Sequence, residues 1–130
     1  MKVNPDKIKI TVHVKIIAKQ GKVEELIDAF EKVYQETREE SGCEYCEVIQ
    51  NIDNPDLITL VEKFSNYQAF KAHMQMPTLR HFIDNLTNTL TEKIDVSFHS
   101  TRIDSIGTRS TPHVEELSFR EDLMDRLDKR

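Results

Sequence analysis

"LVEKFSNYQAFKAHMQMPTLRHF", residues 60–82, joins a strand pattern to a helical pattern that is broken once. Alternating apolar residues predict a strand that ends at Phe64. "SNYQ" (65–68) matches a capping box, in which Ser65 begins a helix by accepting a hydrogen bond from the amide three residues later. Pro77 ends that helix, because the residue before a proline is driven out of the helical region, and it suits the first turn of another helix. We therefore predict a strand followed by a helix in two pieces.

The residues before this stretch supply a strand, a helix and a second strand. "IKITVHVKII" (8–17) alternates apolar and polar side chains, as a strand with one apolar face does. Apolar residues at helical spacing follow over 23–39, and Gly42 suits the left-handed conformation in which many helices end. A strand over about 44–52 and the turn "DNPD" (53–56) then form a hairpin with the strand described above.

A last strand is predicted over 93–103, where Ile94, Val96 and Phe98 share one face. The order of elements is then β-α-β-β-α-β. This is the ferredoxin-like order, an α+β fold with an antiparallel sheet, here with its second helix broken at Pro77.

The character of the sequence changes at Asp104. A linker is followed by residues 112–128, in which apolar residues lie among charges paired four positions apart. This pattern predicts a short amphipathic helix that packs on its own domain or on a partner subunit, and the alternative is a frayed tail. We therefore divide the chain into a domain over 1–103 and a linker with a helical tail over 104–130.

Composition limits the class of protein. The 130 residues suffice for one domain with a core, with 38% hydrophobic and 32% charged residues. No apolar run approaches the roughly 18–20 residues of a membrane span, and the first strand begins too early for a signal peptide, so we expect a cytoplasmic protein. A net charge of −5 without a basic stripe argues against nucleic acid as a partner.

Two patterns raise the question of a redox or metal site. Cys43 and Cys46 form a C-x-x-C motif at the start of a strand, with no second pair to complete a zinc site. We expect two half-buried cysteines of a reduced protein. His73 and His81 are eight residues apart with Pro77 between them, which is not the spacing that places two imidazoles on one helix face. We therefore expect no metal site.

Three segments together resemble the antibiotic biosynthesis monooxygenase domain: "GKVEELIDAF" (21–30), "ESGCEYCEV" (40–48) and the stretch 60–82. The resemblance covers residues 8–103 and leaves the tail outside. It implies a dimeric α/β barrel, in which two protomers pair sheet face to sheet face. It also implies an apolar pocket between sheet and helices. Many members oxidise quinols, anthrones or similar electron-rich phenols with O2 and without metal or flavin.

Two other branches of the family act differently. One degrades haem, and its three functional positions fall here on Val14, Phe64 and Ile83, none of which has the required side chain. Another isomerises phosphorylated autoinducer-2, an enolisable dicarbonyl. This branch and the quinol oxygenases commonly carry a second histidine after the proline, where this chain has Thr78. His81 replaces that histidine only if its side chain turns inward.

The candidate catalytic residues are His73 and Glu62. Imidazole has an ordinary pKa near 6.5, so His73 is suited to accept a proton at neutral pH or to donate one to a substrate oxygen. Glu62 shares a strand face with apolar residues and is placed to orient an imidazole. The alternatives are a structural histidine at a helix corner and a surface carboxylate. The predicted pocket residues are Phe64, Tyr67, Thr78 and His81.

The sequence thus predicts a homodimeric monooxygenase without a cofactor, whose partners are O2 and a small electron-rich aromatic substrate. The first alternative is an isomerase, which needs a phosphate clamp. The basic residues available for such a clamp are Lys15, Lys63, Lys71 and Arg80. The second alternative is a non-catalytic dimeric module that binds a small ligand.

Overall fold

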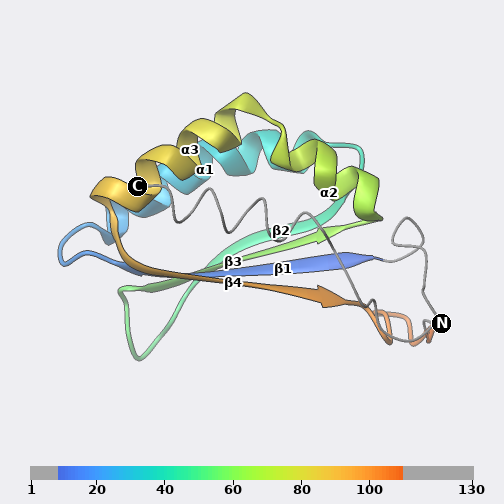
Figure 1. The fold of residues 1–130 in the computed structure, drawn as a ribbon. Helices are drawn as coiled ribbons and strands as arrows, with labels where there is room; N and C mark the ends of the chain where they lie inside the picture. Colours follow the sequence, from blue (N-terminus) through green and yellow to red (C-terminus); the bar gives the residue numbers. More distant parts are fainter. Residues whose placement is uncertain (1–8, 110–130) are drawn as a thin grey trace.

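The structure is a computed structural model that describes residues 9–109. One antiparallel sheet of four strands, in the order β2-β3-β1-β4, carries three helices on one face (Figure 1). The elements are β1 (Ile10–Ala18), α1 (Val23–Glu39), β2 (Cys43–Gln50), β3 (Leu57–Phe64), α2 (Tyr67–Met74), α3 (Pro77–Thr89) and β4 (Thr91–Ser100). The predicted helix over 112–128 lies outside the described residues.

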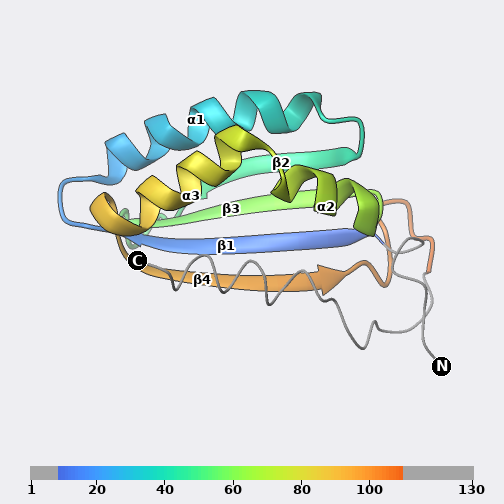
Figure 2. The same ribbon diagram turned by 45° about the horizontal axis from the view of Figure 1, so that its top comes forward.

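The topology confirms the predicted ferredoxin-like α+β fold. β1 lies in the middle of the sheet, where it pairs with β3 on one side and with β4 on the other (Figure 2). β2 and β3 form the predicted hairpin. The second helical region is in two pieces, because Met76 is extended and Pro77 begins α3.

The core lies between the sheet and the helices. β1 and β3 turn alternate side chains toward the helices, so each strand has a buried face and a face that no described helix covers. The buried face packs against α1 and α3 through aliphatic and aromatic side chains. Members of this core are Ile10, Val12, Ile16, Ile58, Leu60 and Phe64 from the sheet and Leu26, Phe30, Val33, Leu79, Ile83 and Leu86 from the helices.

The start of α2 differs from the predicted capping box by one residue. Asn66 is the N-cap, and its side chain accepts a hydrogen bond from the Ala69 N–H at 2.9 Å. Ser65 instead bonds backward: its hydroxyl and its N–H both donate to the carbonyl of Gly42, at 3.2 and 2.9 Å. The end of β3 is thereby joined to the segment that follows α1.

Gly42 was predicted to adopt a left-handed conformation, and this is wrong, because among the described glycines only Gly21 and Gly107 have positive φ. Gly42 is needed for space. A Cβ atom at this position would lie 2.1 Å from the Cβ of Ala69. The absence of a side chain lets the start of α2 approach the segment between α1 and β2.

The bounds of two strands also differ from the prediction. β2 ends at Gln50, because the Asn51 side chain accepts hydrogen bonds from the N–H groups of Asp53 and Asn54 and so forms the turn earlier. β4 begins at Thr91 and ends at Ser100. Beyond it, the Asp104 carboxylate accepts hydrogen bonds from backbone N–H groups and closes a turn.

Candidate active site

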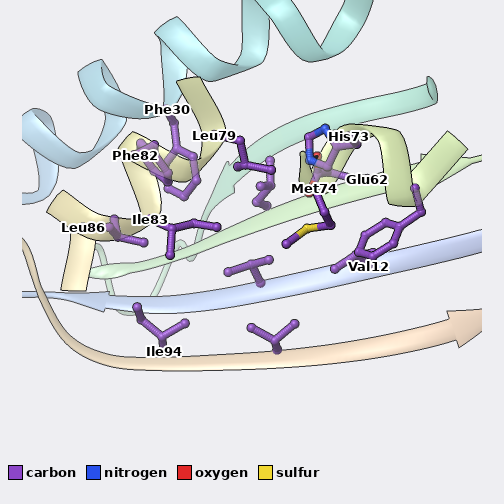
Figure 3. Close-up of a pocket in the computed structure, with 14 residues that line it drawn as sticks. Val12, Phe30, Glu62, His73, Met74, Leu79, Phe82, Ile83, Leu86 and Ile94 are labelled. Carbon is purple, nitrogen blue, oxygen red and sulfur yellow. Dashed lines mark ion pairs between the residues drawn. The ribbon is translucent and has the colours of Figure 1, made fainter. Parts of the chain in front are cut away.

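A small cavity lies between the sheet and the helices α2 and α3. Its volume is about 50 Å³, and its walls are almost entirely apolar. Figure 3 shows Phe82, Ile83 and Leu86 of α3 toward one side and His73 with Glu62 toward the other. Of the described residues that line it, only His73 and Glu62 carry titratable side chains. The other residues of the cavity wall are apolar: Val12, Val14, Phe30, Leu60, Phe70, Met74, Leu79, Ile94 and Val96.

His73 lies between two carboxylates. Its side chain is 2% exposed, with Nδ1 2.8 Å from Glu40 Oε2 and Nε2 3.1 Å from Glu62 Oε2. The side chain of Glu62 is 6% exposed and that of Glu40 is 21% exposed. The three side chains therefore form a chain of contacts from a partly accessible carboxylate to one at the cavity.

This arrangement decides the charge of the ring. Burial disfavours the imidazolium form, but the charges and hydrogen bonds of Glu62 and Glu40 outweigh burial and raise the pKa of His73 to about 9. At neutral pH the ring is therefore an imidazolium that donates one N–H to each carboxylate. The raised pKa disfavours a neutral imidazole base, one of the two roles predicted for His73, at neutral pH. The other predicted role, proton donor, fits the charged ring.

Aromatic packing and hydrogen bonds at the end of α1 and the start of α2 hold this network in place. The His73 ring lies 4.9 Å from the ring of Phe64, centroid to centroid, which closes one side of the imidazole. Glu40 follows the last residue of α1, and its own N–H donates to the Thr37 carbonyl at 3.2 Å. The bonds from Ser65 to Gly42 tie this corner to the start of α2. Glu40 is brought to His73 by these tertiary contacts.

The four predicted pocket residues are placed elsewhere. Phe64 is fully buried behind His73, and Tyr67 is half-buried against the core at the start of α2. Thr78 and His81 line a separate hollow of about 180 Å³ beside α1. The helical rotation of α3 turns Leu79 and Ile83 into the cavity and these two residues away from it. His81 therefore does not stand in for the family's second histidine.

Glu40 is the site residue that the sequence did not reveal. It is separated from His73 by 33 residues, and it follows a run of charged residues at the exposed end of α1. Helical spacing marks the buried face of α1 but says nothing about a residue beyond its last turn. Glu40 contacts His73 close to the point where Gly42 lets α2 approach the segment after α1.

Cys43 and Cys46 are free and half-buried, as predicted. Burial raises the pKa of Cys43 to about 11 and that of Cys46 to about 12, so both thiols are protonated at neutral pH. Within residues 9–109, no group of three histidine, cysteine, aspartate or glutamate side chains is arranged to hold a metal ion. No helix in the same range is long and apolar enough to cross a membrane.

The sequence profile of the family described as antibiotic biosynthesis monooxygenase matches residues 9–85, which contain His73, Glu62 and Glu40. The chain belongs to this family. No curated protein sequence shows significant similarity to the chain.

Solved structures agree with this membership. A protein from Shewanella oneidensis is 30% identical, with a TM-score of 0.71 over 77% of this chain and 95% of the other. A protein from Methanosarcina mazei is 22% identical, with a TM-score of 0.67 over 73% and 94% of the two chains. One from Nitrosomonas europaea, described provisionally as an antibiotic biosynthesis monooxygenase, is 16% identical, with a TM-score of 0.68 over 78% and 95%. The last two likenesses concern the fold alone.

Proposed function

We propose that the protein is a monooxygenase that oxidises a small, electron-rich phenol of the quinol or anthrone type with O2 and without a cofactor. The observation that supports this most directly is the pairing of Glu62 with His73 at one end of an apolar cavity. Apolar walls suit a flat aromatic ring, and the paired charged groups suit removal of its proton.

Each residue has a defined task in this reaction. The carboxylate of Glu62 takes a proton from the substrate and leaves an electron-rich anion in the cavity. The imidazolium of His73 stabilises the negative charge that forms beside it. O2 adds to the anion at a ring carbon. In an anthrone, whose reacting carbon carries two hydrogens, one oxygen atom remains as the carbonyl and the other leaves with both hydrogens as water. In a quinol, one oxygen atom remains on the ring carbon and the other leaves as water with two hydrogens of the substrate, so that the product is a hydroxyquinone.

The size of the cavity limits the substrate. About 50 Å³ is well below the roughly 300–1,000 Å³ of typical ligand pockets, so side chains must move when a ring binds. Met74 lines the cavity and is only partly buried, and methionine changes rotamer easily. The dimensions favour a one-ring substrate over a three-ring one.

The isomerase alternative is weaker. A phosphorylated substrate needs cations, and no described lysine or arginine lines the cavity. Lys15 and Lys63 pair in register with residues on the uncovered face of the sheet, and Lys71 and Arg80 are exposed on the helices. The carboxylate of Glu62 would also repel a phosphate group.

We propose in addition that the uncovered face of the sheet is the interface of a homodimer, as the resemblance to the family implies. No described helix covers this face in Figure 1. Two free thiols fit a reducing compartment, which supports a cytoplasmic location. Analytical ultracentrifugation decides the first point: a monomer at micromolar concentration contradicts the proposed dimer.

Oxygen uptake by the purified, metal-stripped protein tests the proposed activity, with a panel of one-ring quinols and anthrones. We expect Glu62→Gln to reduce kcat by about 100-fold or more, because general base catalysis is typically worth about 10²–10⁴ in rate. Glu92→Gln is the matched control, since Glu92 is an exposed carboxylate of β4, and it should leave kcat unchanged.

Two results would contradict the proposal. Equal uptake by Glu62→Gln and the wild type would remove Glu62 from the chemistry. No uptake with any substrate, together with calorimetric binding of the same quinols, would indicate the non-catalytic ligand-binding module instead.

A further inference from the structure

The proposed reaction uses Glu62 and His73 and leaves Glu40 without a task. Yet Glu40 makes the shorter of the two contacts to the ring, 2.8 Å against 3.1 Å for Glu62. It is also the only carboxylate of the network with appreciable exposure among the described residues. Glu40 does not line the cavity, so it cannot touch a substrate there.

We propose that Glu40 is a positioning residue, which fixes the orientation of the His73 ring and keeps the ring positively charged while the substrate is an anion. This inference rests on the proposed function for its chemical meaning. Its structural basis is that each ring nitrogen contacts a different carboxylate, Nδ1 that of Glu40 and Nε2 that of Glu62.

Orientation follows from the two-sided contact. With Nδ1–H directed to Glu40, the only direction left for Nε2–H is toward Glu62. Without an acceptor at Nδ1, the ring would bury an unpaired N–H group, and rotation about its side-chain bond would no longer be opposed. Phe64 restricts the ring from one side but offers no polar partner.

The charge argument concerns the moment when the substrate loses its proton. Before that step, two carboxylates stabilise the imidazolium. When Glu62 accepts the substrate's proton it becomes neutral, and its support for the imidazolium disappears. Glu40 is then the remaining carboxylate in contact with the ring. It keeps the positive charge on His73 beside the anion that reacts with O2.

The groups that act on the His73 ring come from several elements. Glu62 comes from β3 and Glu40 from the segment after α1, and both act on the ring directly. Cys43 and Cys46 of β2 interact electrostatically with the same two carboxylates, and both thiols are neutral at physiological pH. Phe64 and Phe70 supply apolar surface.

Nuclear magnetic resonance titration of the His73 imidazole, in full-length protein without substrate, tests the inference. We expect Glu40→Gln to lower the His73 titration midpoint by about one pH unit or more, as loss of a neighbouring opposite charge does. Glu39→Gln removes the same charge from the adjacent exposed residue and should leave the midpoint unchanged. An unchanged midpoint in folded Glu40→Gln overturns the inference.

A kinetic arm separates positioning from simple structural support. With a substrate that the wild type oxidises, Glu40→Gln should lower kcat about tenfold or more with a smaller change in KM, because the imidazolium that stabilises the substrate anion is partly lost. The high-pH limb of the kcat profile should move downward together with the His73 midpoint. A shifted midpoint with an unchanged kcat profile would make Glu40 merely structural and overturn the inference.

Two further results keep the test decisive. If Glu40→Gln does not fold, Glu40→Asp replaces it: this variant retains the charge but shortens the side chain, so the His73 midpoint should fall below that of the wild type by less than about one pH unit. In folded Glu40→Asp, an unchanged His73 midpoint together with an unchanged kcat profile would overturn the inference. If the wild type oxidises nothing, the proposed function fails, while the titration still decides whether Glu40 controls His73.

Discussion

The two faces of one sheet give histidine opposite properties. On the helix-covered face, His73 is buried between Glu40 and Glu62, and its pKa is raised to about 9. On the uncovered face, His13 lies 4.6 Å from His99, ring centroid to ring centroid. Burial, His99 and Lys15 lower the pKa of His13.

The difference shows that neighbouring charges can reverse the effect of burial on the charge state of a histidine. Burial acts in the same direction on both rings and disfavours the imidazolium. Carboxylates reverse its effect at His73, whereas a basic residue and a second imidazole reinforce it at His13. A histidine on a strand or helix therefore cannot be assigned as acid or base before its partners are known.

The largest expected effect comes from breaking the network on the covered face. His73→Leu leaves Glu62 buried without its partner, which typically costs about 3–5 kcal/mol of unfolding free energy. His13→Gln on the uncovered face should cost less than about 1 kcal/mol, because partly exposed positions tolerate polar replacement. Urea unfolding at pH 7 measures both.

The double variant His73→Leu/Glu62→Leu tests the reason for that loss. Replacing both partners of a buried ion pair by apolar residues is often close to neutral. The double variant should therefore recover most of the stability that His73→Leu loses. If it recovers none, the loss arises from packing around His73 and the unpaired charge is not its cause.

The pH dependence of stability sharpens the comparison, because the two faces should act in opposite senses. The pKa of His73 is about 9 in the folded chain and 6.5 as the reference value, so its contribution is complete below pH 6.5 and is lost as the pH rises toward 9. At about 1.4 kcal/mol per pKa unit, the loss is on the order of 3 kcal/mol. Urea unfolding between pH 6 and 9.5 measures it.

His13 supplies the opposite slope. Its pKa is lowered in the folded chain, so its contribution is present above pH 6.5 and is lost as the pH falls. The double variant His73→Leu/Glu62→Leu should lack the decline in unfolding free energy above pH 6.5. The variant His13→Gln should show a weaker decline in unfolding free energy below pH 6.5. A wild-type stability that does not fall between pH 6.5 and 9 would mean that His73 is not charged at neutral pH.

Most of the fold could be predicted from the sequence, because its signals are local. Alternation in β1 and β3, helical spacing in α1 and the effect of Pro77 on its neighbours each act within one element. The errors lie where a side chain reaches out of its element. Asn51 closes a turn early, and Ser65 bonds backward to Gly42 and leaves the cap to Asn66.

The site was predictable only in part. Resemblance drew attention to His73 and Glu62, which the structure brings into contact. Glu40 comes from another element, and no periodicity marks it. Thr78 and His81 are close to His73 in sequence, but the rotation of α3 separates them from the cavity. Contacts that depend on how elements approach one another cannot be read from any one segment.

Gly42→Ala tests the approach that brings Glu40 to His73. The added Cβ would lie 2.1 Å from the Cβ of Ala69, so α2 and the segment before β2 must separate. We expect a loss of about 1–3 kcal/mol in unfolding free energy, the usual cost of overpacking. Thermal and urea unfolding measure it. Ala69→Gly in the same chain removes the clashing atom and should restore part of the loss, and the absence of any rescue would place the strain elsewhere.

The smallest effect should be a gain in stability on the covered face. Thr37 of α1 is fully buried, and its Oγ1 has no hydrogen-bond partner among the described residues. An unpaired buried hydroxyl costs about 1–3 kcal/mol, and valine has nearly the same shape, so Thr37→Val should stabilise the protein by about 1 kcal/mol. Thr59→Val is the matched control, because Thr59 of β3 lies on the uncovered face and is not buried, and it should bring no such gain. Urea unfolding of both variants decides the matter. A loss of stability in Thr37→Val would show that the hydroxyl has a partner that the covered face needs, which would extend the polar network of Glu40, His73 and Glu62 into α1.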